Sequence, residues 1–311
     1  MAYATGAYTA IDGGSTGALE KLIAFALANG WSQNGTTAVD GTGYRAHLQK
    51  TIGATTCYFN FRSGTAEGMT NWSWYPFTGI AVIGSTGYNA GSAWNAQPGY
   101  TPLAYNNATA GGACVHALKT TGGTYHFFAS GATLSAVFET ESPYADWRML
   151  TIGTVGGWPF FAASGGNQRN TVSGTSYDAR SAYLLSGYSA GTTAAASLFD
   201  GTYWYSYSMY DHNATYSFVP QVGAATLRGS VAAPIVYYSP DSFRGNVQLA
   251  PSHIAVEKDI DNELWPVGEI EGVKFVNMTN HNNGEQVTYD GDDYRLFRIF
   301  NPKAYGVAFL E

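Results

Sequence analysis

The sequence predicts a mainly β fold, with antiparallel, sandwich-like sheets and one N-terminal α-helix packed on a sheet. Most apolar residues fall in short runs separated by turn signals, several runs alternate polar and apolar residues, and only one segment has helical spacing. Charged residues make up 12% of the 311 residues and aromatic residues 15%. A chain of this composition can bury a core, so we do not expect disorder.

The helix is predicted close to the N-terminus. Its apolar residues follow the spacing i, i+3, i+4, i+7, i+8, which gives one stripe for docking on a sheet: Leu19, Leu22, Ile23, Ala26 and Leu27. Ser15 or Thr16 can cap its start, and Gly30 can end it. Glu20 lies in the first turn, where the helix dipole favours an acid.

The first half of the chain contains six predicted strands. They are Ala54–Arg62, Thr78–Ile83, Ala113–Lys119, Tyr125–Ser130, Thr133–Thr140 and Trp147–Val155. Thr121, Gly122 and Gly123 lie between the third and the fourth, and they predict a hairpin that pairs these two strands.

The middle of the chain differs in composition. Residues 158–196 are rich in Gly, Ser, Ala, Thr and Asn without a clear period, which predicts a loop or insertion. The chain therefore divides into an N-terminal helix and β region (1–157), this loop (158–196) and a C-terminal β region (197–311). We expect the last region to complete the same β domain.

The C-terminal region contains seven predicted strands and most of the charge. The strands are Thr202–Tyr210, Pro234–Tyr238, Gln248–Ala255, Gly272–Asn277, Gln286–Tyr289, Tyr294–Phe300 and Gly306–Leu310. A hairpin turn is predicted over residues 290–293. Residues 251–311 hold 11 acids and 5 bases, a balance of −6 out of a net charge of −7. We expect the last strand to be an ordered, acidic closing edge of a sheet.

Glu139 and Glu141 are the best-placed pair of carboxylates. Residues i and i+2 of a strand share a face roughly 6.5–7 Å apart, which is near the roughly 5–9.5 Å span of glycosidase pairs. Glycosidase carboxylates usually come from different elements, so two adjacent exposed acids are the favoured interpretation. Ser15 and Ser189 lie in G-x-S-x-G matches, which a chain with 38 glycines produces by chance.

Metal chemistry has weak support. Cys114, His116 and His126 are the nearest approach to a ligand set, but the usual Cys-x₂-Cys and His-x₃-His spacings are absent. The sequence predicts no metal, no cofactor and no catalytic residue. Cys57 and Cys114 lie in apolar runs, which favours buried free thiols, and a disulfide between them is the alternative.

Aromatic residues are the candidate contact residues. Exposed Trp and Tyr side chains bind protein partners and stack on sugar rings. The candidates are Trp72, Trp74, Trp94, Tyr203, Tyr205 and Tyr207. A charge-poor surface also favours contacts with other proteins.

Several partners and locations are not expected. The chain has no basic patch, which argues against nucleic acid, and no apolar run approaches the length of a membrane span. The N-terminus lacks the basic and apolar regions of a signal peptide, so we expect folding in a cytosol.

Segments at both ends of the chain resemble a family of virion structural proteins of tailed bacteriophages. The similar segments are Leu27–Trp31, Cys57–Gly64, Asn71–Tyr88, Ala93–Gly99, Ala233–Ser239, Trp265–Gly268, Tyr289–Phe297 and Ala308–Glu311. The resemblance implies a structural component without catalytic residues, most often in the tail or baseplate. A receptor- or carbohydrate-binding module at the tail tip and a capsid decoration protein are the alternatives. Closed rings are usual for such contacts, so we expect a trimer or hexamer.

Overall fold

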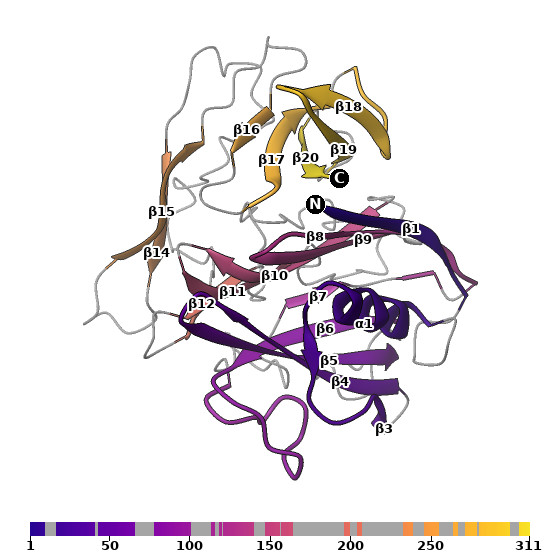
Figure 1. Cartoon of the computed structure of the whole chain (residues 1–311), viewed down its shortest axis with the longest axis vertical. Coiled ribbons are helices and arrows are strands. Elements are labelled where there is room, and N and C mark those ends of the chain that lie inside the picture. Colours follow the sequence, from indigo (N-terminus) through magenta and orange to yellow (C-terminus); the bar gives the residue numbers. More distant parts are fainter. Residues whose placement is uncertain are drawn as a thin grey trace, which may run out of the picture.

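The computed structural model describes residues 1–9, 17–40, 43–65, 78–100, 113–115, 118–119, 121–139, 147–155, 157–163, 196–199, 204–206, 233–238, 246–254, 264–266, 271–278, 280–298 and 305–311. Within these residues the protein is mainly β, with antiparallel sheets and a single short helix near the N-terminus. The predicted fold class is confirmed. The sheets form stacked layers (Figure 1).

The central layer is a seven-stranded sheet in the order β1-β8-β9-β10-β11-β12-β13. Its strands are β1 (Ala2–Tyr8), β8 (Gly123–Ala129), β9 (Thr133–Glu139), β10 (Trp147–Val155), β11 (Trp158–Ala163), β12 (Ala196–Phe199) and β13 (Trp204–Ser206). The predicted loop therefore does not begin at Trp158, which opens a strand paired with β10. Residues 164–195 lie outside the described residues.

The second layer is a six-stranded sheet in the order β2-β4-β5-β6-β7, with β3 also paired with β4. Its strands are β2 (Ser32–Gln33), β3 (Ala38–Asp40), β4 (Gly43–Ile52), β5 (Thr55–Thr65), β6 (Thr78–Ser85) and β7 (Ala113–Val115). The predicted hairpin around Gly122 is wrong, because β7 pairs with β6 here while β8 belongs to the central sheet. Gly122 does form a turn, but the chain uses that turn to enter a different sheet.

The third layer is a five-stranded sheet in the order β16-β17-β20-β19-β18. Its strands are β16 (Leu264–Pro266), β17 (Val273–Asn277), β18 (Glu285–Tyr289), β19 (Asp292–Arg298) and β20 (Tyr305–Leu310). The expectation that the last strand closes an edge is wrong, because β20 lies between β17 and β19. A separate two-stranded sheet pairs β14 (Ala233–Tyr238) with β15 (Asn246–Ile254).

The predicted turn after β18 is confirmed. Tyr289 pairs with Asp292, so only Asp290 and Gly291 form the loop. Their φ angles are 53° and 89°. Positive φ at both central residues is the signature of a type I′ turn, whose twist matches that of the two strands.

The helix α1 (Ala18–Ala28) buries one stripe of side chains, as predicted, except at one position. Leu27 is 44% exposed, so it lies outside the stripe. Gly17 occupies the N-cap without a side-chain cap, and the predicted caps Ser15 and Thr16 lie outside the described residues. The end is as predicted: Gly30 has a φ of 80°, and the Trp31 N–H donates to the Ala26 carbonyl in a Schellman arrangement.

The main core lies between the central sheet, the six-stranded sheet and α1. Alternation along β8 sends Phe127 and Ala129 into this core, while His126 and Phe128 point to the opposite face. That opposite face packs on the five-stranded sheet. Phe128 stacks on Phe309 with ring centroids 4.9 Å apart, and Trp147 contacts Phe297 at 5.4 Å. The central sheet is therefore covered on both faces at β8 and β10.

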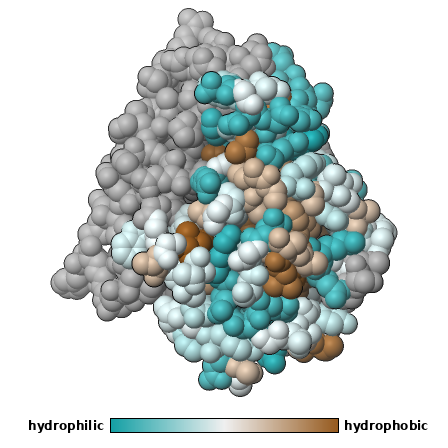
Figure 2. All heavy atoms as spheres, viewed as in Figure 1, coloured by the Kyte–Doolittle hydropathy of each residue, from teal (hydrophilic) through white to brown (hydrophobic). Residues whose placement is uncertain are grey.

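The described part of the surface is mixed. Figure 2 shows hydrophobic patches separated by hydrophilic residues on one face. The large apolar side chains that are exposed are Met1, Leu27, Val39, Tyr100 and Trp158. No helix in the described ranges is long and apolar enough to cross a membrane.

Candidate functional site

Strand β1 forms one edge of the central sheet. It pairs with β8 along its whole length, from Ala2 opposite Ala129 to Tyr8 opposite Gly123. No strand in the described part of the chain pairs with its other side. Its sequence, AYATGAY, contains no charge and no proline, and the side chains of Thr5 and Ala7 are exposed.

The beginning of β1 is held by Tyr3. Its hydroxyl lies 2.8 Å from Nδ1 of His126, and its ring stacks on Phe128 at 5.1 Å. The Arg295 guanidinium lies 5.3 Å from the centroid of the Tyr3 ring. Arg295 is itself fixed, because its Nε donates to Glu311 Oε1 at 2.5 Å. Tyr3 thus joins the edge strand to the five-stranded sheet.

The charge states at this end are set mainly by burial. Burial raises the pKa of Tyr3, and the positive charge of Arg295 only partly opposes this. Burial also lowers the pKa of His126 to about 4, with Arg295 acting in the same direction. At neutral pH a neutral imidazole therefore shares a hydrogen bond with a neutral phenol.

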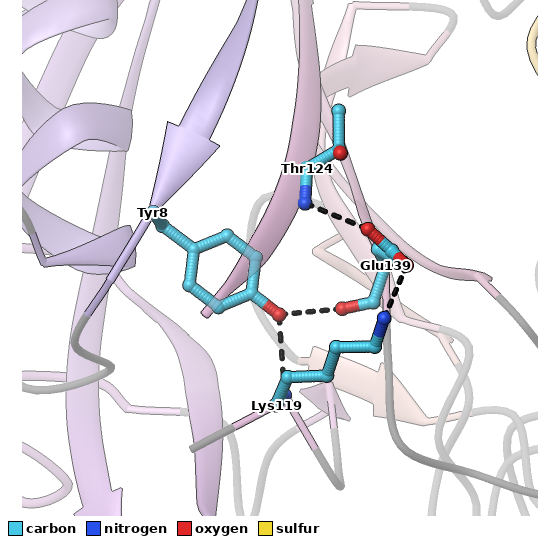
Figure 3. A network of polar contacts seen from close by, with 4 residues as sticks. All are labelled: Tyr8, Lys119, Thr124 and Glu139. Carbon is cyan, nitrogen blue, oxygen red and sulfur yellow. Dashed lines mark hydrogen bonds and ion pairs between the residues drawn. The ribbon is translucent and has the colours of Figure 1, made fainter. Parts of the chain in front are cut away.

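The end of β1 is held by Tyr8, which is buried (Figure 3). The Tyr8 hydroxyl donates to the Glu139 carbonyl at 2.5 Å and accepts from the Lys119 N–H at 3.2 Å. The Lys119 ammonium pairs with Oε1 of Glu139, and the Thr124 N–H donates to Oε2 at 2.9 Å. Four residues from separate segments therefore fasten the end of β1 to the sheet.

Glu139 does not have the geometry of a free general acid. Both carboxylate oxygens accept hydrogen bonds within this network. Burial alone would raise the pKa of Glu139, but the hydrogen bonds from Lys119 and Thr124 outweigh it and hold the pKa below its ordinary value. Its predicted partner Glu141 lies outside the described residues, as do Ser15 and Ser189.

The two candidate metal ligands that the structure describes, Cys114 and His126, lie in different sheets. His126 lies on β8 of the central sheet, whereas Cys114 lies on β7 of the six-stranded sheet, opposite Ala81. His116 lies outside the described residues. In the ranges that the structure describes, no three His, Cys, Asp or Glu side chains form a group that could hold a metal ion.

Cys57 is a buried free thiol, so it does not form the alternative disulfide with Cys114. Burial raises its pKa to about 12, which keeps the thiol protonated and unreactive.

Trp94 is not an exposed contact residue. It is 4% exposed and packs against Ala81 and Ile83 on the outer face of the six-stranded sheet. It belongs to the loop at residues 86–100, which folds over that face. The sequence suggested exposure because the loop is polar and rich in glycine, but the sheet face beneath it needs an apolar cover.

Of the other candidate contact aromatics, Tyr205 alone lies among the described residues. Tyr205 lies on β13, opposite Leu198 of β12. Trp72, Trp74, Tyr203 and Tyr207 lie outside the described residues.

Sequence patterns did not reveal β1 as a strand. Alanine and glycine make up four of its seven residues, so its alternation between faces is weak. The available signals were Tyr3, Thr5 and Tyr8, which are residue types that favour strands.

Comparisons with known proteins do not identify a family. No protein-family model matches the chain, and no curated protein matches it significantly. The functional argument therefore depends on the residues and their geometry.

Proposed function

We propose that the protein is a non-enzymatic structural component of a tailed-bacteriophage virion, located in the tail or baseplate. It would be assembled in the host cytoplasm and act through contacts with other virion proteins and with copies of itself, in a trimer or hexamer. The family resemblance of several segments suggested this role, and the structure adds one observation in its favour. That observation is β1, an uncharged sheet edge that is fixed at both ends.

A fixed, unprotected edge suits assembly. Its outward N–H and C=O groups can accept another strand, which is a common mode of protein recognition. The first residues of a chain usually fray, but here the hydroxyls of Tyr3 and Tyr8 both form hydrogen bonds with other strands. A strand that is already ordered loses little entropy when a partner binds.

The catalytic alternative has less support. The carboxylate of Glu139, the best candidate acid, accepts hydrogen bonds from Lys119 and Thr124, and its backbone carbonyl accepts one from Tyr8 of β1. We expect Glu139→Gln to leave any degradation of host-surface polysaccharide by purified virions unchanged. A loss of degradation in that variant would favour a glycosidase.

The virion role can be tested on particles of the bacteriophage that encodes the chain. Quantitative mass spectrometry of purified virions should detect the protein, and gold-labelled antibodies should mark the tail or baseplate. Label over the whole head, with a correspondingly high copy number, would favour a capsid decoration protein. Absence from purified virions would contradict the proposal.

The carbohydrate-binding alternative predicts a different result. A receptor- or carbohydrate-binding module at the tail tip should bind a host-surface glycan through exposed aromatic residues. Trp94 cannot contribute in its buried position. A glycan array with binding above background would favour this alternative, and we expect none.

A further inference from the structure

The edges of the sheets differ in how they are protected against pairing. Short edge strands, proline and charged residues are the usual protective devices. Among the described edges, β2, β3, β7, β13 and β16 have only two or three residues. The longer edge strands carry proline or charge: Pro234 in β14, Pro251 in β15 and Glu285 in β18.

Strand β1 has none of these devices. It has seven residues without charge or proline. Its side chains are mostly small, since Ala2, Ala4, Gly6 and Ala7 leave the backbone accessible. It is therefore the described edge that is best suited to accept another strand.

We propose that β1 pairs with β1 of a second copy of this chain, antiparallel about a two-fold axis at Thr5. Thr5 is the middle residue of the strand, so this register pairs all seven residues: Thr5 with Thr5, Tyr3 with Ala7 and Ala2 with Tyr8. The two central sheets then become one continuous sheet. The inference rests on the proposed assembly role, because it names one of the contacts that role needs.

Three features of this edge favour a second copy as the occupant. An antiparallel strand pair is compatible with two-fold symmetry, so one surface can serve both partners. The edge carries no charge, so two copies do not repel each other across it. Thr5 is exposed, and its hydroxyl already donates to the Tyr125 carbonyl, so no hydrogen-bond donor of this side chain is left unpaired when it faces its own copy.

The symmetry of this contact restricts the assembly. A two-fold contact gives a dimer, or a hexamer built from three such dimers, but it does not by itself give a trimer. Of the two expected states, the hexamer is therefore the one that can contain this pairing.

The first test is the oligomeric state of the full chain in solution. Sedimentation velocity across a concentration series should show a species of two or six times the 33.2 kDa chain mass. Thr5→Lys places two like charges opposite each other, and we expect the dissociation constant of the pair to rise roughly tenfold. Val39→Lys, at a 69% exposed position on the edge strand β3, is the matched control and should change nothing.

The second test is a cross-link, which reports the register directly. Thr5→Cys should form a covalent dimer on mild oxidation, because paired Cα atoms lie about 4.5–5.5 Å apart, within disulfide range. Ala7→Cys on the same strand should not, because its two copies would lie roughly 14 Å apart. This test remains decisive if Thr5→Lys fails to fold.

Several results would overturn the pairing. These are a monomer at every concentration, a trimer, an oligomer that Thr5→Lys leaves as tight as Val39→Lys does, or equal cross-linking of the two cysteine variants. A monomer whose β1 amides are protected from hydrogen exchange only inside the virion would show that a different protein occupies the edge. A Thr5-linked dimer that is absent from virions would instead contradict the proposed function alone.

Discussion

At the scale of single residues, Gln97 organises the loop at residues 86–100. It is 1% exposed, and its Nε2 donates to the carbonyls of Asn89, Ser92 and Ala93 at 3.1–3.2 Å. Its Oε1 accepts from the Asn89 N–H at 2.7 Å. One side chain therefore satisfies four backbone groups and holds the loop over the six-stranded sheet.

Gln97→Ala should destabilise the protein by about 1–3 kcal/mol, because it removes the side-chain hydrogen bonds that hold this loop together. Urea unfolding followed by circular dichroism measures this. Gln286→Ala, the same substitution at an exposed position, is the control and should stay within about 0.5 kcal/mol of the parent. Equal stability of the two variants would show that the Gln97 hydrogen bonds do not hold the loop.

Glu139→Gln should lower stability at neutral pH by about 1 kcal/mol, because the Lys119 ion pair is lost. The pKa of Glu139 is held below its ordinary value, so its stabilisation is present above the ordinary carboxyl pKa and is lost as the pH falls through the folded value. The difference between parent and variant should therefore shrink in acid. Urea midpoints measured from neutral to acid pH test this.

Asp292→Asn is the matched control for that series. Asp292 is exposed on β19, and we expect its variant to follow the parent at every pH. A Glu139→Gln variant that also followed the parent would show that the Glu139 carboxylate does not stabilise the fold.

At the scale of elements, His126 lies where the central sheet packs on the five-stranded sheet. Its ring lies 5.3 Å from that of Trp147 and 5.0 Å from that of Phe297. The ionisable groups near it are Tyr3 and Arg295, and Arg295 is paired with Glu311. Protonated His126 would place a second positive charge near Arg295 in this buried contact.

The pH dependence follows from the pKa of His126, which burial lowers from 6.5 to about 4. Between these values the unfolded chain binds a proton that the folded chain does not, so stability falls as the pH falls from about 6.5 to about 4. The loss is at most about 3 kcal/mol. His126→Phe should flatten this part of the stability profile.

Tyr3→Phe is the control for the His126 prediction. It removes the hydroxyl next to Nδ1 but keeps the titrating ring, so the fall in stability should persist. Chemical denaturation at a series of pH values compares the three proteins. Parallel profiles for the parent and His126→Phe would contradict the assignment of the pH dependence to this residue.

Local signals predicted some elements better than others. The turn at Asp290 and Gly291 was predictable because both positions need positive φ, which these residue types tolerate. The pairing around Gly122 was not, because a glycine turn does not specify which sheet the next strand joins. The burial of Trp94 likewise depends on the sheet face that its own loop covers, and the role of Glu139 depends on contacts with other segments of the chain. Strand β1 was missed because its small residues give no clear periodicity.

At the scale of the whole molecule, the C-terminal strand β20 is the middle strand of the five-stranded sheet. β20 supplies the partner for both β17 and β19, and Glu311 follows directly after it. Deletion of Tyr305–Glu311 removes the centre of this sheet and the carboxylate that orients Arg295. We expect loss of the cooperative unfolding transition, measured by calorimetry.

Glu311→Gln tests the ion pair with Arg295 independently of strand β20. It removes the charge that faces Arg295 but leaves β20 in place, so a cooperative transition should remain. A deletion variant that unfolded like the parent would show that the five-stranded sheet forms without its central strand.

We propose that this protein is a virion component whose β1 edge joins copies of the chain. A density map of the assembled bacteriophage particle, at a resolution that separates strands, tests it most directly. We predict density for this fold in the tail or baseplate, with β1 of two copies paired antiparallel around Thr5. A particle without this chain, or one in which β1 faces solvent in every copy, would contradict the claim.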